Sequence, residues 1–176
     1  MAGGSRVQEI INGRIAMSDP HTGSGRVFLV VVDDSEEMRA ALMFSCRRAR
    51  HTGGRVALLR VIEPTEYQHF ASIGKLMREE ARQDAEALLQ RLAAEVNELS
   101  GELPVLYVRE GNPREEVIAL INEEPLISVL TLAADTGSGG PGPLVSALSG
   151  KFIGKLRVPL TIIPGNLTAE QIEAIT

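Results

Sequence analysis

The sequence predicts an α/β fold in which an open five-stranded parallel sheet carries helices on both faces. Two observations lead to this prediction. Five short apolar segments alternate with four segments whose apolar residues recur at helical spacing, the order typical of a parallel sheet with crossover helices. The first apolar segment, 27–32, is a continuous run rich in valine, as in a strand buried on both faces. The 176 residues suffice for one such domain and are too few for two.

Each element has a local signal. Asp34 and Glu37 have the spacing of a capping box, so a helix is expected to follow them and to end at the glycine pair 53–54. The clearest helix is 77–99, where apolar residues recur every three or four positions. Its charged residues at 79, 80, 82 and 84 are interpreted as a solvated face. Further helical patterns begin at the turn 111–113 and at Pro143. The strands are expected at 27–32, 56–62, 104–108, 126–132 and 158–163.

The chain divides into three parts. Residues 1–25 hold one weak apolar stretch and a turn-rich segment, and are predicted to form a mobile N-terminal arm. Residues 26–164 carry all the strands and helices of the α/β domain. Residues 165–176 form a short acidic C-terminal tail, in which 169–175 has the pattern of one or two helical turns.

Composition excludes several classes of function. The formal net charge is -5 and there is no long basic run, which argues against nucleic acid as a partner. No apolar run approaches the roughly 18 residues that cross a bilayer, so no membrane association is expected and a soluble, cytoplasmic protein is predicted. Cys46 is the only cysteine and falls on the apolar face of a helix. The three histidines are scattered, so the sequence predicts neither catalytic residues nor a metal site.

A ligand site is expected where the strands of such a sheet end at their carboxyl termini. Asp33, Val61 and the glycine-rich segment 135–143 converge there. Helix capping is the alternative explanation for Asp33 and Asp34, and a flexible surface loop is the alternative for the glycines. The segment lacks the strand context of a dinucleotide fingerprint, and Gly150-Lys151 lacks the hydroxyl residue and first glycine of a P-loop.

Two motifs resemble those of the universal stress proteins. Residues 30–35, Val-Val-Val-Asp-Asp-Ser, are similar to the end of that family's first strand, and Gly111-Asn112-Pro113 is similar to its turn into the third helix. The resemblance covers 26–164 and implies a sheet of order 3-2-1-4-5, the adenine-nucleotide alpha-hydrolase-like fold, commonly a homodimer, and in one branch bound ATP. The nucleoside contacts of that branch correspond here to Val32, Asp33, Val61, Leu132 and Ala133.

The phosphate motif of that branch is only partly present. Gly137-x2-Gly140-x9-Gly150 keeps the glycine spacing, but Lys151 stands at the hydroxyl position. A helix starting after Gly150 would span only about 9 Å, too short to return along a strand of about 17 Å. A start at Pro143 gives about 14 residues, with Gly140, Gly142 and Ser146 as the phosphate cradle. Since no Lys or Arg lies between 126 and 150, backbone amides and a metal ion such as Mg²⁺ would hold the phosphates alone.

These observations favour a stress-response protein that binds an adenine nucleotide, with ATP as the first expectation. The alternative is a protein of the same fold that binds no nucleotide and acts only through protein partners, and a slow ATP hydrolase is the third possibility. A homodimer is expected through the fifth strand, 158–163, whose apolar edge lacks protecting charges. The alternative cover for that edge is the tail, 167–175. The protein partners themselves are not predicted.

Overall fold

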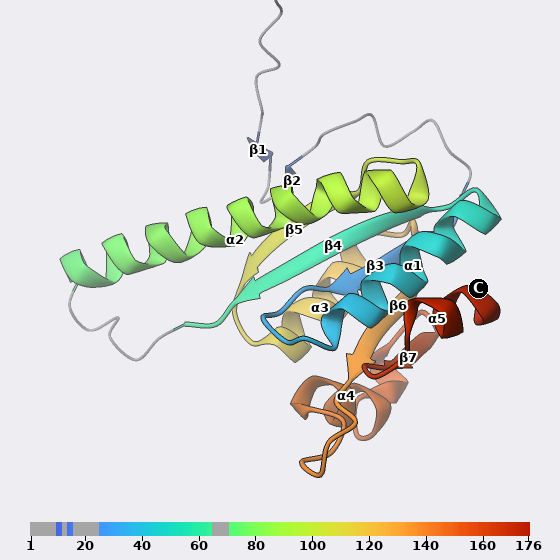
Figure 1. Cartoon of the computed structure of the whole chain (residues 1–176). Coiled ribbons are helices and arrows are strands. Elements are labelled where there is room, and N and C mark those ends of the chain that lie inside the picture. The colour runs from blue at the N-terminus through green and yellow to red at the C-terminus, as the bar shows by residue number, and fades with distance from the viewer. Residues whose placement is uncertain (1–9, 12–13, 16–24, 65–70) are drawn as a thin grey trace, which may run out of the picture.

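The computed structural model describes residues 10–11, 14–15, 25–64 and 71–176. Within these residues one sheet has the strand order β1-β2-β5-β4-β3-β6-β7 (Figure 1). Its parallel part has the predicted order 3-2-1-4-5, with the first strand of the domain at the centre. The parallel strands, from one edge to the other, are β5 (Val105–Glu110), β4 (Arg55–Ile62), β3 (Val27–Val31), β6 (Ile127–Ala134) and β7 (Leu160–Pro164).

Two short strands extend the sheet beyond β5. They are β1 (Ile10–Ile11) and β2 (Arg14–Ile15), which pair with each other in antiparallel fashion. β2 also runs antiparallel to β5. Both fall in the segment that was predicted as an arm, and the other residues of 1–24 lie outside the described residues.

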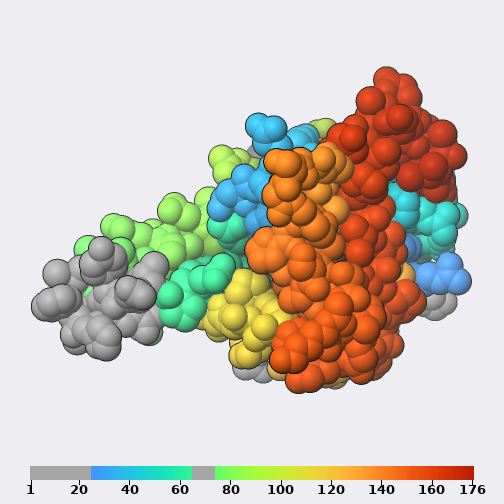
Figure 2. Space-filling model, turned by 90° about the horizontal axis from the view of Figure 1, so that it is seen from below, coloured from blue at the N-terminus to red at the C-terminus, as the bar shows by residue number. Residues whose placement is uncertain are grey.

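Helices cover both faces of the sheet. On one face, α1 (Met38–Thr52) and α2 (Ala71–Ser100) enclose a core with β3 and β4. On the other, α3 (Pro113–Glu123) and α4 (Pro143–Ser149) enclose a second core with β4 and β6. Both cores are almost entirely aliphatic, as the scarcity of aromatic residues requires. The start of α2 projects beyond the rest of the molecule (Figures 1 and 2). No helix in the described part of the chain combines the length and the apolar character that a membrane span needs.

The predicted capping box at the start of α1 is wrong. The helix begins at Met38, and the side chain of the preceding residue, Glu37, makes no capping hydrogen bond. The Asp34 carboxylate forms an ion pair with Arg60 of β4 instead, at 2.6 Å. Because a charged partner from a neighbouring strand is available, Asp34 turns away from the helix. Because the helix begins only at Met38, its first turn contains no acidic side chain.

The start of α4 is as predicted, and its length is not. The helix is under way at Leu144 but ends at Ser149, so it has 7 residues and not the expected 14 or so. A turn and the short 3-10 helix η2 (Ile153–Lys155) complete the return toward β7. The predicted apolar helix face is therefore divided between two segments. Val145 and Leu148, on α4, are buried in the core, while Phe152, which follows the helix, packs against the same core.

Arg157 connects the segment before β7 to the end of α3. Its guanidinium donates through Nε and Nη2 to the carbonyl of Ile121, and through Nη2 to the carbonyl of Glu124 at 3.0 Å. α3 has no basic residue in its own last turn. A cation from a distant segment thus satisfies the Ile121 carbonyl in the last turn of α3 and adds a second donor to the Glu124 carbonyl, which also accepts from the Ile127 amide.

The C-terminal tail forms α5 (Ala169–Ile175), as its pattern predicted. Ile172 is buried with Ala40 of α1 and Ile163 of β7, so α5 covers one face of the sheet near its edge. No described segment pairs with the outer edge of β7, which is the last strand of the sheet. Ile162, in the middle of that strand, is 38% exposed.

Candidate functional site

A cleft of about 1030 Å³ lies at the carboxyl ends of β3 and β4. The order in which successive strands are added to the sheet reverses here, since β3 has β4 on one side and β6 on the other, both parallel to it. Open parallel sheets bind ligands at this point because the loops leave the central strands in opposite directions. The lining combines the strand ends with α2, the start of α3 and the start of α4, and comprises residues 31–34, 60–63, 81, 84, 85, 87, 88, 91, 112–114, 143, 144 and 147.

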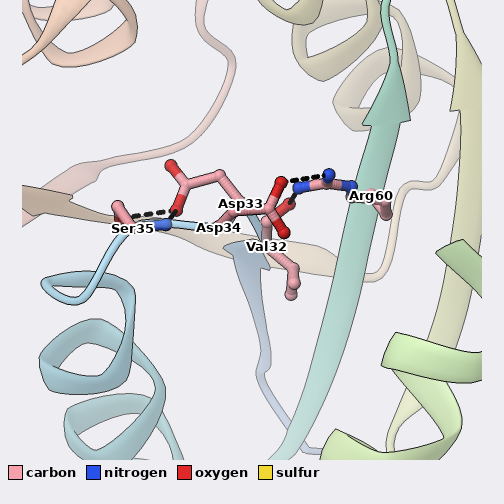
Figure 3. A network of polar contacts seen from close by, with 5 residues as sticks. All are labelled: Val32, Asp33, Asp34, Ser35 and Arg60. Carbon is pink, nitrogen blue, oxygen red and sulfur yellow. Dashed lines mark hydrogen bonds and ion pairs between the residues drawn. The ribbon is translucent and has the colours of Figure 1, made fainter. Parts of the chain in front are cut away.

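Two adjacent carboxylates at the end of β3 have different partners (Figure 3). Asp33 Oδ1 accepts hydrogen bonds from the Ser35 amide, at 3.0 Å, and from the Ser35 hydroxyl, at 2.5 Å. Asp34 is held on the other side by Arg60. Asp33 Oδ2 takes part in no hydrogen bond among the described residues, and Asp33 is exposed in the cleft. This oxygen is therefore a fixed acceptor that a bound molecule can reach.

Arg60 of β4 binds the backbone and a side chain at the end of the central strand, β3. Its Nη1 donates to the carbonyl of Val32 at 3.3 Å while its Nη2 contacts Asp34, so one guanidinium satisfies a backbone group and a charge together. The Val32 amide is already bonded to the Leu59 carbonyl at 2.7 Å. These bonds fix the backbone that positions Asp33.

The start of α3 forms part of the opposite wall. Asn112 caps the helix, because its side-chain oxygen accepts from the amides of Arg114 and Glu115 at 3.1 and 3.4 Å. Pro113 occupies the first helical position, where its missing N–H costs nothing. Residues 112–114 all line the cleft.

The structure brings together some of the predicted site residues. Val32, Asp33 and Val61 all line the cleft. Leu132 and Ala133 do not, since Leu132 is buried in one core and Ala133 packs against the other.

The predicted cradle residues Gly137, Gly140, Gly142 and Ser146 also lie outside the lining, although Pro143, Leu144 and Ala147 belong to it. The Gly137 amide is bonded to Asp135, and the Ser146 hydroxyl donates to the Gly142 carbonyl at 2.8 Å. Gly140 and Gly142 have φ angles of 87° and 93°, which favour glycine.

Sequence reasoning missed the charges in the cleft. Arg60, Arg91 and Arg114 line it from β4, α2 and α3. Asp84, interpreted above as part of a solvated face, lines it too. One signal was available, since Arg60 is a lone charge inside an apolar strand. Arg91 and Asp84 gave none, because helical periodicity does not distinguish a wall of a cleft from an ordinary exposed face.

The structure offers little for covalent or metal chemistry. Cys46 is fully buried in α1, and burial, reinforced by the charge of Glu95, raises the pKa of its thiol to about 12. A thiol with this pKa is not a nucleophile near neutral pH. Among the described residues, no group of three or more His, Cys, Asp or Glu side chains is placed to hold a metal ion.

Comparison with known proteins agrees with this architecture. The family model for the universal stress protein family matches residues 26–164. Universal stress protein UspA from Lactobacillus plantarum has 17% sequence identity and a TM-score of 0.67, over 78% of this chain and 97% of that chain. The universal stress protein from Archaeoglobus fulgidus in complex with dAMP has 15% identity and a TM-score of 0.53, over 79% and 97%.

A universal stress protein family protein from Arabidopsis thaliana with AMP bound has 14% identity and a TM-score of 0.56, over 79% of this chain and 91% of that chain. No curated sequence matches the chain. At these identities the structural likeness establishes the fold. The family model spans well over half of the sequence, and on that ground the chain belongs to the universal stress protein family.

Proposed function

We propose that this protein binds an adenine nucleotide in the cleft at the ends of β3 and β4. The observation that carries the proposal is Asp33, a residue of the cleft lining whose Oδ1 is fixed by Ser35 while its Oδ2 makes no hydrogen bond among the described residues. A carboxylate held in this way is a strong acceptor for the hydroxyl groups of a ribose. The AMP and dAMP complexes named among the structural neighbours support the choice of ligand class.

The remaining lining suits the other parts of a nucleotide. Val61, Leu144 and Ala147 offer apolar surface for a base, and the arginines offer charge for phosphate. The assignment of phosphate contacts to Gly137, Gly140, Gly142 and Ser146, and of nucleoside contacts to Leu132 and Ala133, stays a prediction. Since no side-chain cluster among the described residues fits a metal, Mg²⁺ would enter as a complex with the phosphates.

Isothermal titration of ATP, ADP and AMP, with and without Mg²⁺, onto protein freed of copurified ligand tests the proposal. Asp33→Asn is the informative variant, because asparagine keeps an acceptor for Ser35 while removing the charge and the second acceptor. It is expected to weaken nucleotide binding about tenfold or more. Glu98→Gln, an equally conservative change on the exposed side of α2, is the control and leaves affinity unchanged.

The result also separates the alternatives. Wild-type protein that binds none of the three nucleotides contradicts the proposal and favours the interaction protein without nucleotide. Release of phosphate from bound ATP would favour the slow hydrolase. Equal binding by wild type and Asp33→Asn would show that the ligand lies elsewhere.

Dimerisation through β7 is the second part of the proposal. The strand ends the sheet, and Ile162 remains partly exposed beside its unpaired edge. Sedimentation equilibrium at micromolar concentration is expected to show a dimer for the wild type and a monomer for Ile162→Lys. Ile175→Lys is the matched control, since Ile175 is also an exposed isoleucine, at 55%, but lies on α5. A monomeric wild type would contradict this part.

A further inference from the structure

Three cations surround one aromatic ring beside the cleft. The Arg114 guanidinium carbon lies 4.3 Å from the centre of the Phe152 ring. The ammonium nitrogens of Lys151 and Lys155 lie 5.6 and 5.3 Å from the same centre. We call these four residues the Phe152 cluster. It forms where the start of α3 meets the segment after α4.

The positive charge of the Phe152 cluster is poorly compensated within the described residues. In the part of the chain that the structure describes, its one ion pair joins Arg114 to Glu115 at 3.4 Å, and the Glu115 side chain is 69% exposed. Contact with the ring offsets part of the repulsion between the cations, since an aromatic face attracts positive charge. The chain as a whole carries a net charge of -5, so this is a local excess against the overall balance.

Arg114 connects the cluster to the cleft, because it belongs to both. The other arginines of the cleft differ in this respect. Arg60 is already committed to Asp34 and to the Val32 carbonyl. Arg91, on the α2 wall, makes no ion pair among the described residues, but it stands apart from the lysines of the Phe152 cluster. Positive charge is therefore most concentrated at the end of the cleft between α3 and α4.

We propose that the Phe152 cluster is an anion site that holds the phosphate groups of the nucleotide, with Arg114 contacting the first phosphate and the two lysines any further ones. This inference rests on the proposed function of the cleft. It supplies the charge that the glycine-rich segment lacks, because no Lys or Arg occurs between residues 126 and 150. Arginine suits the first position, since its planar fork matches two phosphate oxygens.

Four probes separate recognition of the phosphates from recognition of the nucleoside: adenosine, AMP, ATP and inorganic tripolyphosphate. Arg114→Gln is expected to lower AMP affinity about tenfold while adenosine affinity stays within twofold. The double variant Lys151→Gln with Lys155→Gln is expected to weaken ATP and tripolyphosphate more than AMP. Arg78→Gln and Lys75→Gln remove equivalent charges from the exposed start of α2 and are the controls. Circular dichroism confirms that each variant is folded.

The outcomes distinguish this inference from the proposed function. If all nucleotides bind but the ratio of AMP to adenosine affinity is the same in wild type and Arg114→Gln, the anion site is refuted and the proposed function stands. Equal weakening of adenosine and AMP also refutes it, because Arg114 would then act only through packing. If no adenosine-containing probe binds, the proposed function fails. Tripolyphosphate binding is then the remaining test of the anion site. If the wild type binds tripolyphosphate and Arg114→Gln does not, the anion site is supported; if both proteins bind it equally, or the wild type does not bind it, the anion site is refuted.

Discussion

Gly165 lies where the end of β7 passes the start of α1, and replacing it with alanine should disturb both. A Cβ atom added to Gly165 would lie 2.2 Å from Cβ and 3.0 Å from Cα of Glu37. It would also lie 3.1 Å from the carbonyl oxygen of Ala134, which already accepts a bond from the Gly165 amide at 2.9 Å. Carbon atoms in contact prefer about 3.5 to 4.0 Å, so the overlap exceeds roughly 1 Å.

The overlap cannot be relieved by a change of rotamer, because Cα and Cβ of Glu37 move only with the backbone. Overpacking of this kind costs about 1 to 3 kcal/mol. For a chain of this size, 2 kcal/mol corresponds to a fall in Tm of about 4 to 8 °C. Thermal unfolding followed by circular dichroism measures the shift.

Gly154→Ala provides the matched control. A Cβ atom at Gly154, in η2, meets no other atom within 4 Å. The same chemical change should leave Tm unchanged or raise it slightly, because alanine restricts the unfolded chain. The packing argument is refuted if Gly165→Ala has the same Tm as Gly154→Ala and the wild type.

Three further predictions concern single side chains. Thr131→Val should stabilise the fold by about 1 kcal/mol in urea unfolding, because the Thr131 hydroxyl is buried without a hydrogen-bond partner in the described structure; a loss of stability would contradict this. Burial raises the pKa of the Cys46 thiol from 9.0 to about 12, so this thiol should react slowly with a disulfide reagent at pH 8 and rapidly in guanidinium; prompt reaction of the native protein would be inconsistent with this burial. The same shift should lower the free energy of unfolding as pH rises above 9, because the thiol then ionises in the unfolded chain before it does in the folded one. Asn112→Ala should lower the free energy of unfolding by about 1 kcal/mol in thermal unfolding, because it removes the α3 cap. Asn112→Asp keeps a capping oxygen and should retain most of the wild-type stability.

The fold could be predicted because its signals are local and repeated. A valine-rich run indicated the central strand, and α2 and the start of α4 followed from apolar spacing and Pro143. The strand order required the family resemblance, since pairing between distant strands leaves no trace in local pattern. The capping box failed for the same reason. The spacing of Asp34 and Glu37 is correct for a cap, but Arg60 lies on another strand and competes for Asp34.

The cleft was predictable in outline and not in its charges. Asp33 and Val61 end neighbouring strands, so the topology alone brings them to the same place. Arg91 and Arg114 come from two different helices, and only the packing of those helices decides that both line the cleft. The shortness of α4 was also hidden, because Phe152 keeps the helical spacing of Leu144 and Leu148 although the helix has ended.

The contacts of Arg157 bear on the order in which the molecule opens. This residue bonds to the carbonyl of Ile121, 36 positions earlier in the chain, so the last turn of α3 is complete only when the segment before β7 is in place. Transient detachment of β7 therefore also releases the end of α3, and the amide hydrogens of both segments should exchange with solvent at a common opening free energy. β3 and β4, each paired on both sides within the sheet, are expected to exchange more slowly.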